Sequence, residues 1–317
     1  MKAYIVEHLR EAGTLKTVAE PEPGNHDVVV RITAAGINPV DWKVRDRDDR
    51  PRPFTLGQDF AGIVIGIGNS VQNYHQDDRV FGIARRNGAY AEATLCTVDD
   101  PTSPICRLPD SIGDSDAAAV PTPGLTAMAC FEKLTLAAGS RIAILGATGA
   151  LGQIAVQIAR NKGLQVTGTG SERDEKYLRE LGCVEYVTRE SRQTPAAMHA
   201  ALHEIAPEGF DAVIDTVNYA NGIQAVAEIL RPQGTLISVN RAIDDSAFDA
   251  SKITALNVNL VGSRASSHEG LRNLAKMLES NAIRPPRFVE RDFSDALQAL
   301  DQVKSRTIHE KVVLTFR

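Results

Sequence analysis

The amino-acid sequence predicts an α/β protein with two domains, a β-rich domain and a doubly wound domain with a parallel sheet. The length of 317 residues is typical of two domains. The first third contains three short β-branched runs, MKAYIV, DVVVRITAAGI and AGIVIGIG, which Pro, Gly and Asp separate. From Arg141 onward, strand-like and helix-like segments alternate, and this alternation predicts βαβ units and a parallel sheet.

Polar connections are expected between the strands of the first domain. Residues 38–57 are rich in charge and are interpreted as a loop or a short helix. An Asn-Gly turn is expected to separate two strand-like pieces within residues 81–97. Residues 117–136 have a helical composition after a Pro-x-Pro-Gly start, and they lead into the second domain.

The second domain is expected to alternate strands with helices. The strands are predicted at 141–146, 164–170, 184–188, 212–217, 234–240 and 259–264, and the helices at 150–163, 171–182, 198–206 and 220–231. A helix at 268–283 and a strand at 311–316 follow. We expect residues 1–118 and 284–317 to form the β-rich domain and residues 119–283 to form the parallel-sheet domain.

Composition argues against several classes of function. The formal net charge of -5 provides no basic patch for nucleic acid and no polybasic anchor for a membrane. The longest uncharged run, Ile142–Ala159, contains glycines and glutamines, which argue against a membrane span. The N-terminus has charged residues where a secretion signal needs an apolar segment. The four cysteines form no CxxC pair, so a reduced, cytoplasmic protein is expected.

A glycine-rich turn lies between the first strand and the first helix of the second domain. Its glycines, Gly146, Gly149 and Gly152, have the spacing GxxGxxG, whereas the usual dinucleotide-binding spacing is GxGxxG. Glycines at this spacing can still form a tight turn, let backbone N–H groups approach a pyrophosphate and permit close helix–strand packing, as those of the usual motif do. The helix N-terminus adds unpaired N–H donors and a positive dipole end. Within its βαβ pattern, the turn predicts a nucleotide site.

The end of the second strand of that domain indicates which coenzyme binds. An NAD site requires an acidic residue there to accept hydrogen bonds from the ribose hydroxyls. Here the strand is followed by Ser171 and Arg173, with Lys176 close behind, and these side chains suit a 2′-phosphate. Glu172 could instead accept from the ribose. NADPH is therefore expected, with NADH as the less favoured alternative.

Several motifs, in order along the chain, resemble the medium-chain dehydrogenase/reductase superfamily. They are AAGINPVDWKVR, PFTLGQDFAGIVIGIG, DDRVFGIA, GAYAEAT, PTPGLTA, GATGALGQIAVQIA, VIDTV and HEKVVLTF. The chain is most similar to the zinc-independent quinone oxidoreductase branch, which resembles zeta-crystallin. This resemblance implies a GroES-like domain, a Rossmann domain, an active-site cleft and a homodimer, joined through the strand near residues 259–264.

The zinc-binding branch of that superfamily is not matched. Its members hold catalytic zinc with a cysteine in the first loop and a His-Glu pair, whereas this chain has INPVDW and Gln58–Asp59. A catalytic zinc needs three protein ligands and an open position. No zinc or other metal ion is therefore expected. His199 and His203 are one helical turn apart, but without a third ligand they are interpreted as a solvated helix face.

The resemblance also implies roles for individual residues. Asn38 is expected near the nicotinamide ribose and the substrate, with Asp41 and Trp42 on the same loop. Trp42 and Tyr90 are either pocket walls or packing residues. The expected coenzyme contacts are Asn38 and Thr126 at the nicotinamide; Gly146, Ala147, Thr148, Gly149, Ala150 and Leu151 at the pyrophosphate; Ser171, Arg173, Lys176 and Arg189 at the 2′-phosphate; and Val217, Ser238, Val239, Asn240, Ser263, Arg264 and Arg306 elsewhere.

The expected function is NADPH-dependent hydride transfer to a quinone or a similar conjugated carbonyl, without zinc. A conjugated carbonyl accepts hydride without a metal, so the protein mainly orients its ligands and excludes water. A 2-alkenal or enone reductase would use the same kind of site. A protein that binds NADPH without turnover, as a sensor or a structural protein, is a further alternative.

Overall fold

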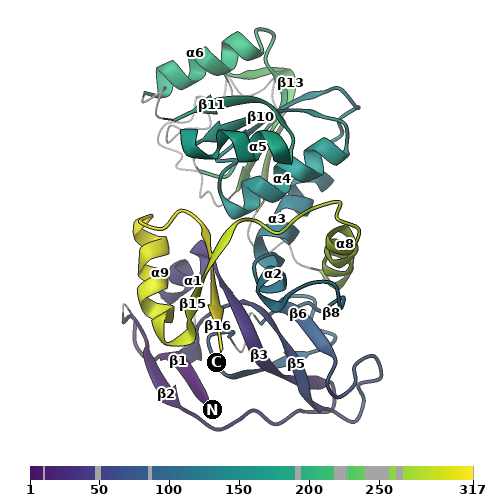
Figure 1. The fold of residues 1–317 in the computed structure, drawn as a ribbon, viewed down its shortest axis with the longest axis vertical. Coiled ribbons are helices and arrows are strands. Elements are labelled where there is room, and N and C mark those ends of the chain that lie inside the picture. Colours follow the sequence, from purple (N-terminus) through teal and green to yellow (C-terminus); the bar gives the residue numbers. More distant parts are fainter. Residues whose placement is uncertain are drawn as a thin grey trace. The chain divides into compact units, whose positions relative to one another are not determined.

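The chain divides into two compact units in the computed structural model (Figure 1). The first unit combines Met1–Leu125 with Ser266–Arg317, and the second is Thr126–Ala265. The structure describes residues 1–9, 11–46, 51–84, 88–189, 194–217, 226, 228–239, 257–261 and 267–316. The α/β class with a β-rich unit and a parallel-sheet unit, as predicted from sequence, is confirmed.

The first unit contains two sheets. The larger has the order β15-β16-β3-β5-β6-β8, with β7 paired to β3, and the smaller has the order β2-β1-β4. Their strands are β1 Lys2–Val6, β2 Thr14–Thr17, β3 Asp27–Ile37, β4 Phe54–Thr55, β5 Asp59–Ile67, β6 Arg79–Ile83, β7 Ala93–Thr97, β8 Ile105–Arg107, β15 Phe288–Asp292 and β16 Lys311–Thr315.

The long strand β3 organises the larger sheet. Its sequence, DVVVRITAAGI, is rich in β-branched residues, and most of its side chains are buried. It pairs antiparallel with β5 along most of its length, with β7 near its start and with β16 near its end. In this register Ile37 lies opposite Val312, and Gly36 lies opposite Asp59. The residue after β3 is therefore held between two neighbouring strands.

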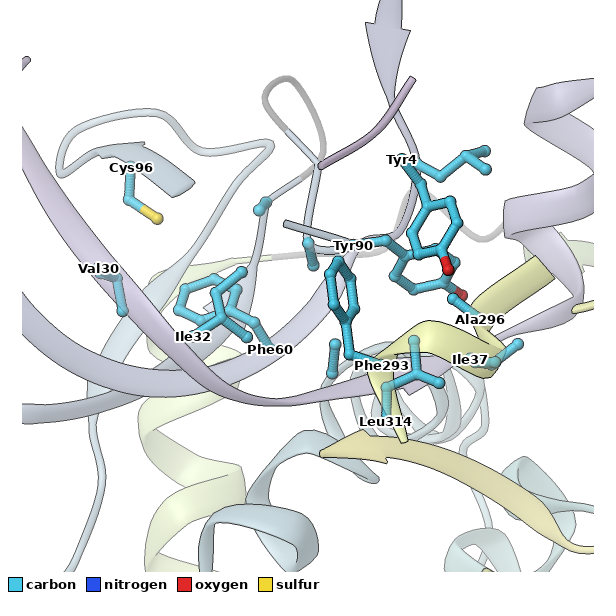
Figure 2. Packing of buried hydrophobic residues seen from close by; sticks show 14 of the residues in the cluster. Tyr4, Val30, Ile32, Ile37, Phe60, Tyr90, Cys96, Phe293, Ala296 and Leu314 are labelled. Carbon is cyan, nitrogen blue, oxygen red and sulfur yellow. The ribbon is translucent and has the colours of Figure 1, made fainter. Parts of the chain in front are cut away.

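The core of this unit lies between the sheets and the C-terminal helix. Figure 2 shows Tyr4, Tyr90, Phe293 and Ala296 gathered around the end of β3. The rings of Tyr4 and Phe293 meet edge to face, with their centroids 5.2 Å apart. The Tyr4 hydroxyl donates to the Ser294 carbonyl at 2.7 Å, so this buried phenol is paired. The C-terminal segment therefore completes the core of the N-terminal domain.

The helices of this unit are α1 Pro39–Arg45, α2 Asp114–Ala118, α8 His268–Glu279 and α9 Ala296–Ser305, with the 3-10 helix η5 Phe293–Asp295. In Figure 1, α1 lies beside α9, and both belong to this unit. Helix α3, Pro121–Glu132, carries the chain into the second unit. A loop or a short helix was expected within residues 38–57, and α1 is a short helix at the start of that range.

The boundaries between the units differ from those expected at residues 118 and 284. Helix α8 belongs to the first unit because it packs against β8. Its residue Leu274 lies against Gly124, and its residue Gly270 lies against Leu125. The helical pattern of residues 268–283 resembles that of the preceding helices, so the sequence contains no sign that this helix packs on the other domain.

The second unit contains a parallel sheet with the order β11-β10-β9-β12-β13-β14. The strands are β9 Arg141–Leu145, β10 Gln165–Gly170, β11 Cys183–Thr188, β12 Phe210–Asp215, β13 Leu230–Val239 and β14 Asn257–Val261. The helices are α4 Ala150–Asn161, α5 Glu175–Leu181 and α6 Pro195–Ile205, with the 3-10 helix η1 Glu172–Asp174. The helix expected at 220–231 lies mostly outside the described residues.

The strand order reverses beside β9, because β10 pairs with one edge of β9 and β12 pairs with the other. Ligands of open parallel sheets bind at the carboxyl ends of the strands at such a reversal. Helix α4 begins directly after β9 and is buried from Gly152 to Ala159. A Cβ atom at Gly152 would overlap the Gly146 carbonyl oxygen and the backbone of Ala147. Gly152 therefore permits the close helix–strand contact.

We expect Gly152→Ala to lower the free energy of unfolding by about 1–3 kcal/mol, as overpacking typically does. This direction is opposite to that of an ordinary helix position, where Gly to Ala stabilises by roughly 0.5–1 kcal/mol. Chemical denaturation of the purified variants measures the difference. Gly149→Ala is the matched control, because a Cβ there would contact only the Gly146 carbonyl oxygen, at 3.6 Å. Equal stability of the two variants would contradict the packing role.

Candidate functional site

The glycine-rich turn of the second unit is held by its neighbouring strands. Gly146 has a φ of 83°, which favours glycine, and its N–H donates to the Thr169 hydroxyl at 3.1 Å. The Ala147 N–H donates to the Thr169 carbonyl at 2.9 Å. A Cβ atom at Gly146 would overlap Thr216 and Val217, so the end of β12 covers this side of the turn. Val217 itself is 45% exposed.

The other side of the turn is open at the start of α4. Gly149 is the N-cap residue, with a φ of -70°, and therefore has no side chain to cap the helix. Its open surroundings do not require glycine for packing. The first N–H groups of a helix have no intrahelical partner, and they attract anions together with the helix dipole. Residues 147–151 therefore form a cradle that fits a pyrophosphate, and a side chain at Gly149 would narrow it.

The residues predicted for a 2′-phosphate gather at the ends of β10 and β11. Ser171 follows β10, and the Tyr186 hydroxyl donates to its carbonyl at 2.9 Å. Arg189 follows β11, and its N–H donates to the Gly170 carbonyl at 2.7 Å. Arg173 is half exposed, with its Nε 3.6 Å from Asp174. Tyr186 was not among the predicted residues, although its place in the third strand is visible in the sequence.

Acidic residues lie beside Lys176 and Arg179. Lys176 lines a shallow hollow on η1 and α5 together with Glu172, Glu175, Arg179 and Glu180. In this hollow Arg179 binds Glu175 at 2.9 Å, one helical turn away. Lys176 and Arg179 therefore share this hollow with three carboxylates, and one of these is the carboxylate of Glu172. The charges in this hollow fit both alternatives: Lys176 could bind a 2′-phosphate, and Glu172 could accept hydrogen bonds from ribose hydroxyls.

The remaining predicted coenzyme residues are more dispersed. Ser238 and Val239 end β13, and Ser238 lies opposite Asp215 of β12. Thr126 is buried in α3. Arg306 is exposed beyond the end of α9, in the first unit. The other three predicted residues, Asn240, Ser263 and Arg264, lie outside the described residues.

Asn38 and Asp41 lie together at the start of α1 in the first unit. Asn38 is the N-cap residue, Pro39 follows it, and the Asn38 N–H donates to Asp41 Oδ2 at 2.8 Å. The Tyr90 hydroxyl donates to the same oxygen at 2.9 Å. Asp41 Oδ1 is buried and has no hydrogen-bond partner among the described residues. Burial is the main cause that raises the pKa of Asp41 to about 7, and Asp59 adds to it.

The two aromatic residues predicted near Asn38 have different surroundings. Tyr90 is fully buried, and burial together with the neighbouring Asp41 raises its pKa well above the ordinary value. Trp42 is half buried and lies between two ammonium groups, Lys43 at 5.7 Å and Lys304 at 5.6 Å from its ring. Lys304 belongs to α9, so Trp42 packs where α1 meets that helix.

A buried group of charged and polar side chains surrounds the Asn38 amide. The Asn38 Nδ2 donates to Asp59 Oδ2 at 2.7 Å, and Lys311 Nζ donates to Asn38 Oδ1. Lys311 Nζ lies 3.4 Å from Asp59 Oδ2. The Thr122 N–H donates to Asp59 Oδ1 at 3.1 Å, and the Thr122 hydroxyl donates to the same oxygen. Burial lowers the pKa of Lys311, whereas Asp59 and Asp41 oppose that shift.

Asp59, Thr122 and Lys311 were not among the predicted site residues. The sequence does contain a sign of them, because Gln58–Asp59 stands where a His-Glu pair would bind zinc, and Lys311 begins an otherwise apolar strand. Among the described residues, no group of three or more His, Cys, Asp or Glu side chains is arranged to hold a metal ion. No helix within the described ranges is both long and apolar enough to cross a membrane.

Comparisons with known proteins agree with this fold. Residues 24–114 match the family model "Alcohol dehydrogenase GroES-like domain", and residues 150–280 match the model "Zinc-binding dehydrogenase". Quinone oxidoreductase from Sus scrofa is 31% identical over 218 residues, which are 66% of this chain and 64% of the relative. The Rattus norvegicus protein of that name is 36% identical over 173 residues, 53% of this chain and 51% of the relative. These alignments thus span about half to two thirds of the relatives.

Solved structures extend the likeness to the whole chain. Quinone oxidoreductase from Coxiella burnetii has a TM-score of 0.87 and 25% identity, covering 100% of this chain and 99% of that one. Escherichia coli quinone oxidoreductase, solved in complex with NADPH, has a TM-score of 0.86 and 21% identity. The match covers 99% of this chain and 100% of that one. The GroES-like and Rossmann units define a medium-chain dehydrogenase/reductase architecture. Within that superfamily, the chain is similar to quinone oxidoreductases.

The buried Asp41 carboxyl predicts a pH-dependent stability. Its folded-state pKa of about 7 exceeds the unfolded value of about 3.9, so the folded protein binds more protons between these pH values. Asp41 therefore makes the wild type less stable as pH rises through this window. We expect Asp41→Asn to remove roughly 2 kcal/mol of the decline between pH 5 and pH 8, given 1.36 kcal/mol per pKa unit.

Denaturant unfolding at several pH values measures this slope for both proteins. Asp110→Asn is the control, because Asp110 is exposed and is not part of the buried group around Asn38. The same pH slope in Asp41→Asn and in the wild type would contradict a protonated Asp41.

Proposed function

We propose that the protein is an NADPH-dependent oxidoreductase that reduces a quinone or a similar conjugated carbonyl without zinc. The observation that carries this proposal is the turn from Gly146 to Gly152, which leaves an open anion cradle at the start of α4. The similarity to quinone oxidoreductases supports the reaction class. The Escherichia coli relative solved with NADPH supports the choice of coenzyme.

The residues that would hold NADPH lie at the carboxyl ends of the parallel strands. The backbone of residues 147–151 would bind the pyrophosphate, and Val217, Ser238 and Val239 would line the neighbouring strand ends. Ser171, Arg173, Lys176 and Arg189 would bind the 2′-phosphate. An arginine offers a planar pair of donors and a lysine a point charge, so both suit a phosphate. The carboxylate of Glu172 would favour NADH if it accepted from the ribose hydroxyls instead.

When bound, NADPH supplies the hydride. The residues of the chain then have to orient the substrate, keep water away and leave a proton available. Asn38 would orient the substrate through its amide, whose direction hydrogen bonds to Asp59 and Lys311 determine. A conjugated carbonyl needs no metal to accept hydride, and one proton completes the reduction. Orientation in a water-excluded site supplies most of the help that such a reaction requires.

The donor set around Asn38 suits a reaction without zinc. Structural and catalytic zinc sites use cysteine, histidine and carboxylate ligands. Gln58 and Asp59 occupy the place of a zinc-binding His-Glu pair, and the Asp59 carboxylate already accepts hydrogen bonds from Thr122 and Asn38 beside the Lys311 ammonium. A zinc ion at this place would have to displace the Lys311 ammonium from a buried carboxylate.

We also propose a homodimer. Strand β14 is the last strand of the described parallel sheet, so an unpaired edge is available for a second copy. Dimers with a two-fold axis are the commonest homo-oligomers, and two copies of an edge strand can pair across such an axis. Light scattering after gel filtration measures the mass, and a monomer at micromolar concentration would contradict this proposal.

The coenzyme preference is tested by calorimetric titration with NADPH and NADH. We expect NADPH to bind at least about tenfold more tightly, because a hydrogen bond to a charged group contributes about 1.5–3 kcal/mol. The double variant Arg173→Ala/Lys176→Ala should lose this preference while it still binds NADH. The control Lys133→Ala/Lys162→Ala removes two exposed cations elsewhere in the second unit. Equal or tighter NADH binding in the wild type would favour the Glu172 alternative.

Turnover is tested by the oxidation of NADPH with a panel of quinones, 2-alkenals and enones. We expect quinone-dependent oxidation, and Gly149→Ala should raise the Kd for NADPH by about tenfold, since its side chain narrows the pyrophosphate cradle. A preference for 2-alkenals would favour the enone reductase. Tight NADPH binding without turnover of any acceptor would favour a sensor or structural protein. Unchanged NADPH affinity in Gly149→Ala would contradict the cradle.

A further inference from the structure

The ion pair between Asp59 and Lys311 is the least exposed charged pair of the described chain, with 0% and 3% of the two side chains exposed. A buried ion pair is weak evidence for stability, because removing both charges from water offsets much of their attraction. Apolar residues of similar size often stabilise a core equally well. The presence of both charges at this place therefore calls for a reason other than stability.

Both charges act on the Asn38 amide. The Asp59 carboxylate accepts from Asn38 Nδ2 at 2.7 Å, and the Lys311 ammonium donates to Asn38 Oδ1. A flipped amide would point its NH2 group at the ammonium and its oxygen at the carboxylate. Both contacts would then be repulsive in a region from which water is excluded. The two charges thus select one of the two amide orientations.

The backbone supports this arrangement from separate elements. Asp59 begins β5 opposite Gly36, and Lys311 begins β16 beside the same end of β3. A Cβ atom at Gly36 would overlap the Ala118 carbonyl oxygen and would approach Lys311 Cε and Nζ to 3.1 Å, so the glycine leaves room for the end of α2 and for the ammonium group. Thr122 donates from its N–H and its hydroxyl to the Asp59 carboxylate. The carboxylate therefore has little freedom to rotate.

The amide retains limited capacity for a further ligand. A carboxamide has two N–H donors and two acceptor lone pairs. One N–H of the Asn38 amide donates to Asp59. The other is only weakly engaged, because Asn38 Nδ2 lies 3.5 Å from the Gly36 carbonyl oxygen. One lone pair of Oδ1 is used by Lys311. The amide can thus offer a ligand one weakly engaged donor and one lone pair, both in directions that the ion pair determines.

We propose that Asp59 and Lys311 are positioning residues that hold the Asn38 carboxamide in its reactive orientation. This inference rests on the proposed function, because it takes Asn38 as the group that orients the substrate. Neither Asp59 nor Lys311 touches the substrate; both act through Asn38. The pair therefore contributes to turnover by orientation, and only a carboxamide at position 38 can transmit its effect.

The first test uses the neutral pair Asp59→Asn/Lys311→Met, which removes both charges together and leaves no unpaired buried ion. We expect kcat with a quinone to fall by about 10- to 100-fold, as misplacement of an orienting group does, while the Kd for NADPH stays within about twofold. The matched control Arg79→Met/Asp114→Asn removes another ion pair of the first unit, which joins β6 to α2. That control should retain the wild-type kcat.

The second test separates positioning from a general structural effect. In an Asn38→Ala background, the neutral pair should change kcat by less than about twofold, because the group that transmits its effect is absent. A further loss of 10-fold or more in that background would overturn the proposal. So would a wild-type kcat in the neutral pair. If the neutral pair does not fold, Asp59→Asn/Lys311→Gln, which keeps polar groups at both positions and also leaves no unpaired buried ion, replaces it in both tests.

The third test needs no turnover, so it remains decisive if the proposed function fails. Protein labelled with [15N]asparagine gives side-chain NH2 signals, and Asn38→Ala identifies the signal of Asn38. In the wild type we expect this NH2 group to exchange slowly with D2O, and in the neutral pair at least about 10-fold faster, because its charged acceptor is lost. An unchanged signal and exchange rate would overturn the positioning role. Absence of turnover in the wild type, with the expected change in exchange, would overturn only the proposed reaction.

Discussion

The pairing of β3 with three other strands is the constraint on which the first unit depends. β3 meets β7 at its start, β5 along its length and β16 at its end, and the last of these strands comes from the far C-terminus. The chain beyond Ile37 therefore emerges between two fixed neighbours. Asn38 starts α1 at that place, with Asp59 and Lys311 beside it. A shift of one residue in either register would turn one of these charges to the other face of the sheet.

The two units use the end of a strand in different ways. In the second unit the strand β9 leads into a glycine-rich turn, and the proposed binding surface there is the backbone, because N–H groups and a helix dipole attract an anion. In the first unit the strand β3 ends in a polar side chain, whose direction is set by buried charges. The backbone site depends on glycine at positions 146 and 152, whereas the Asn38 site depends on the identity of three side chains.

Charge inside the first unit is nearly balanced by protonation. Asp59 and Lys311 form an ion pair, while the raised pKa of Asp41 favours its neutral form below about pH 7, so the buried group carries little net charge in weakly acidic solution. The desolvation that raises the pKa of Asp41 also strengthens the contacts of its neighbours.

The sequence by itself determined the fold class, the two units and the nucleotide turn, because hydrophobic periodicity and glycine spacing act over a few residues. It also predicted a role for Asn38 and Asp41 through a resemblance in their loop. Only the tertiary structure joined Asn38 to Asp59, Thr122 and Lys311, which are up to 273 residues apart. It alone placed α8 in the first unit. Strand pairing and helix packing decide such contacts, and neither leaves a local pattern in the chain.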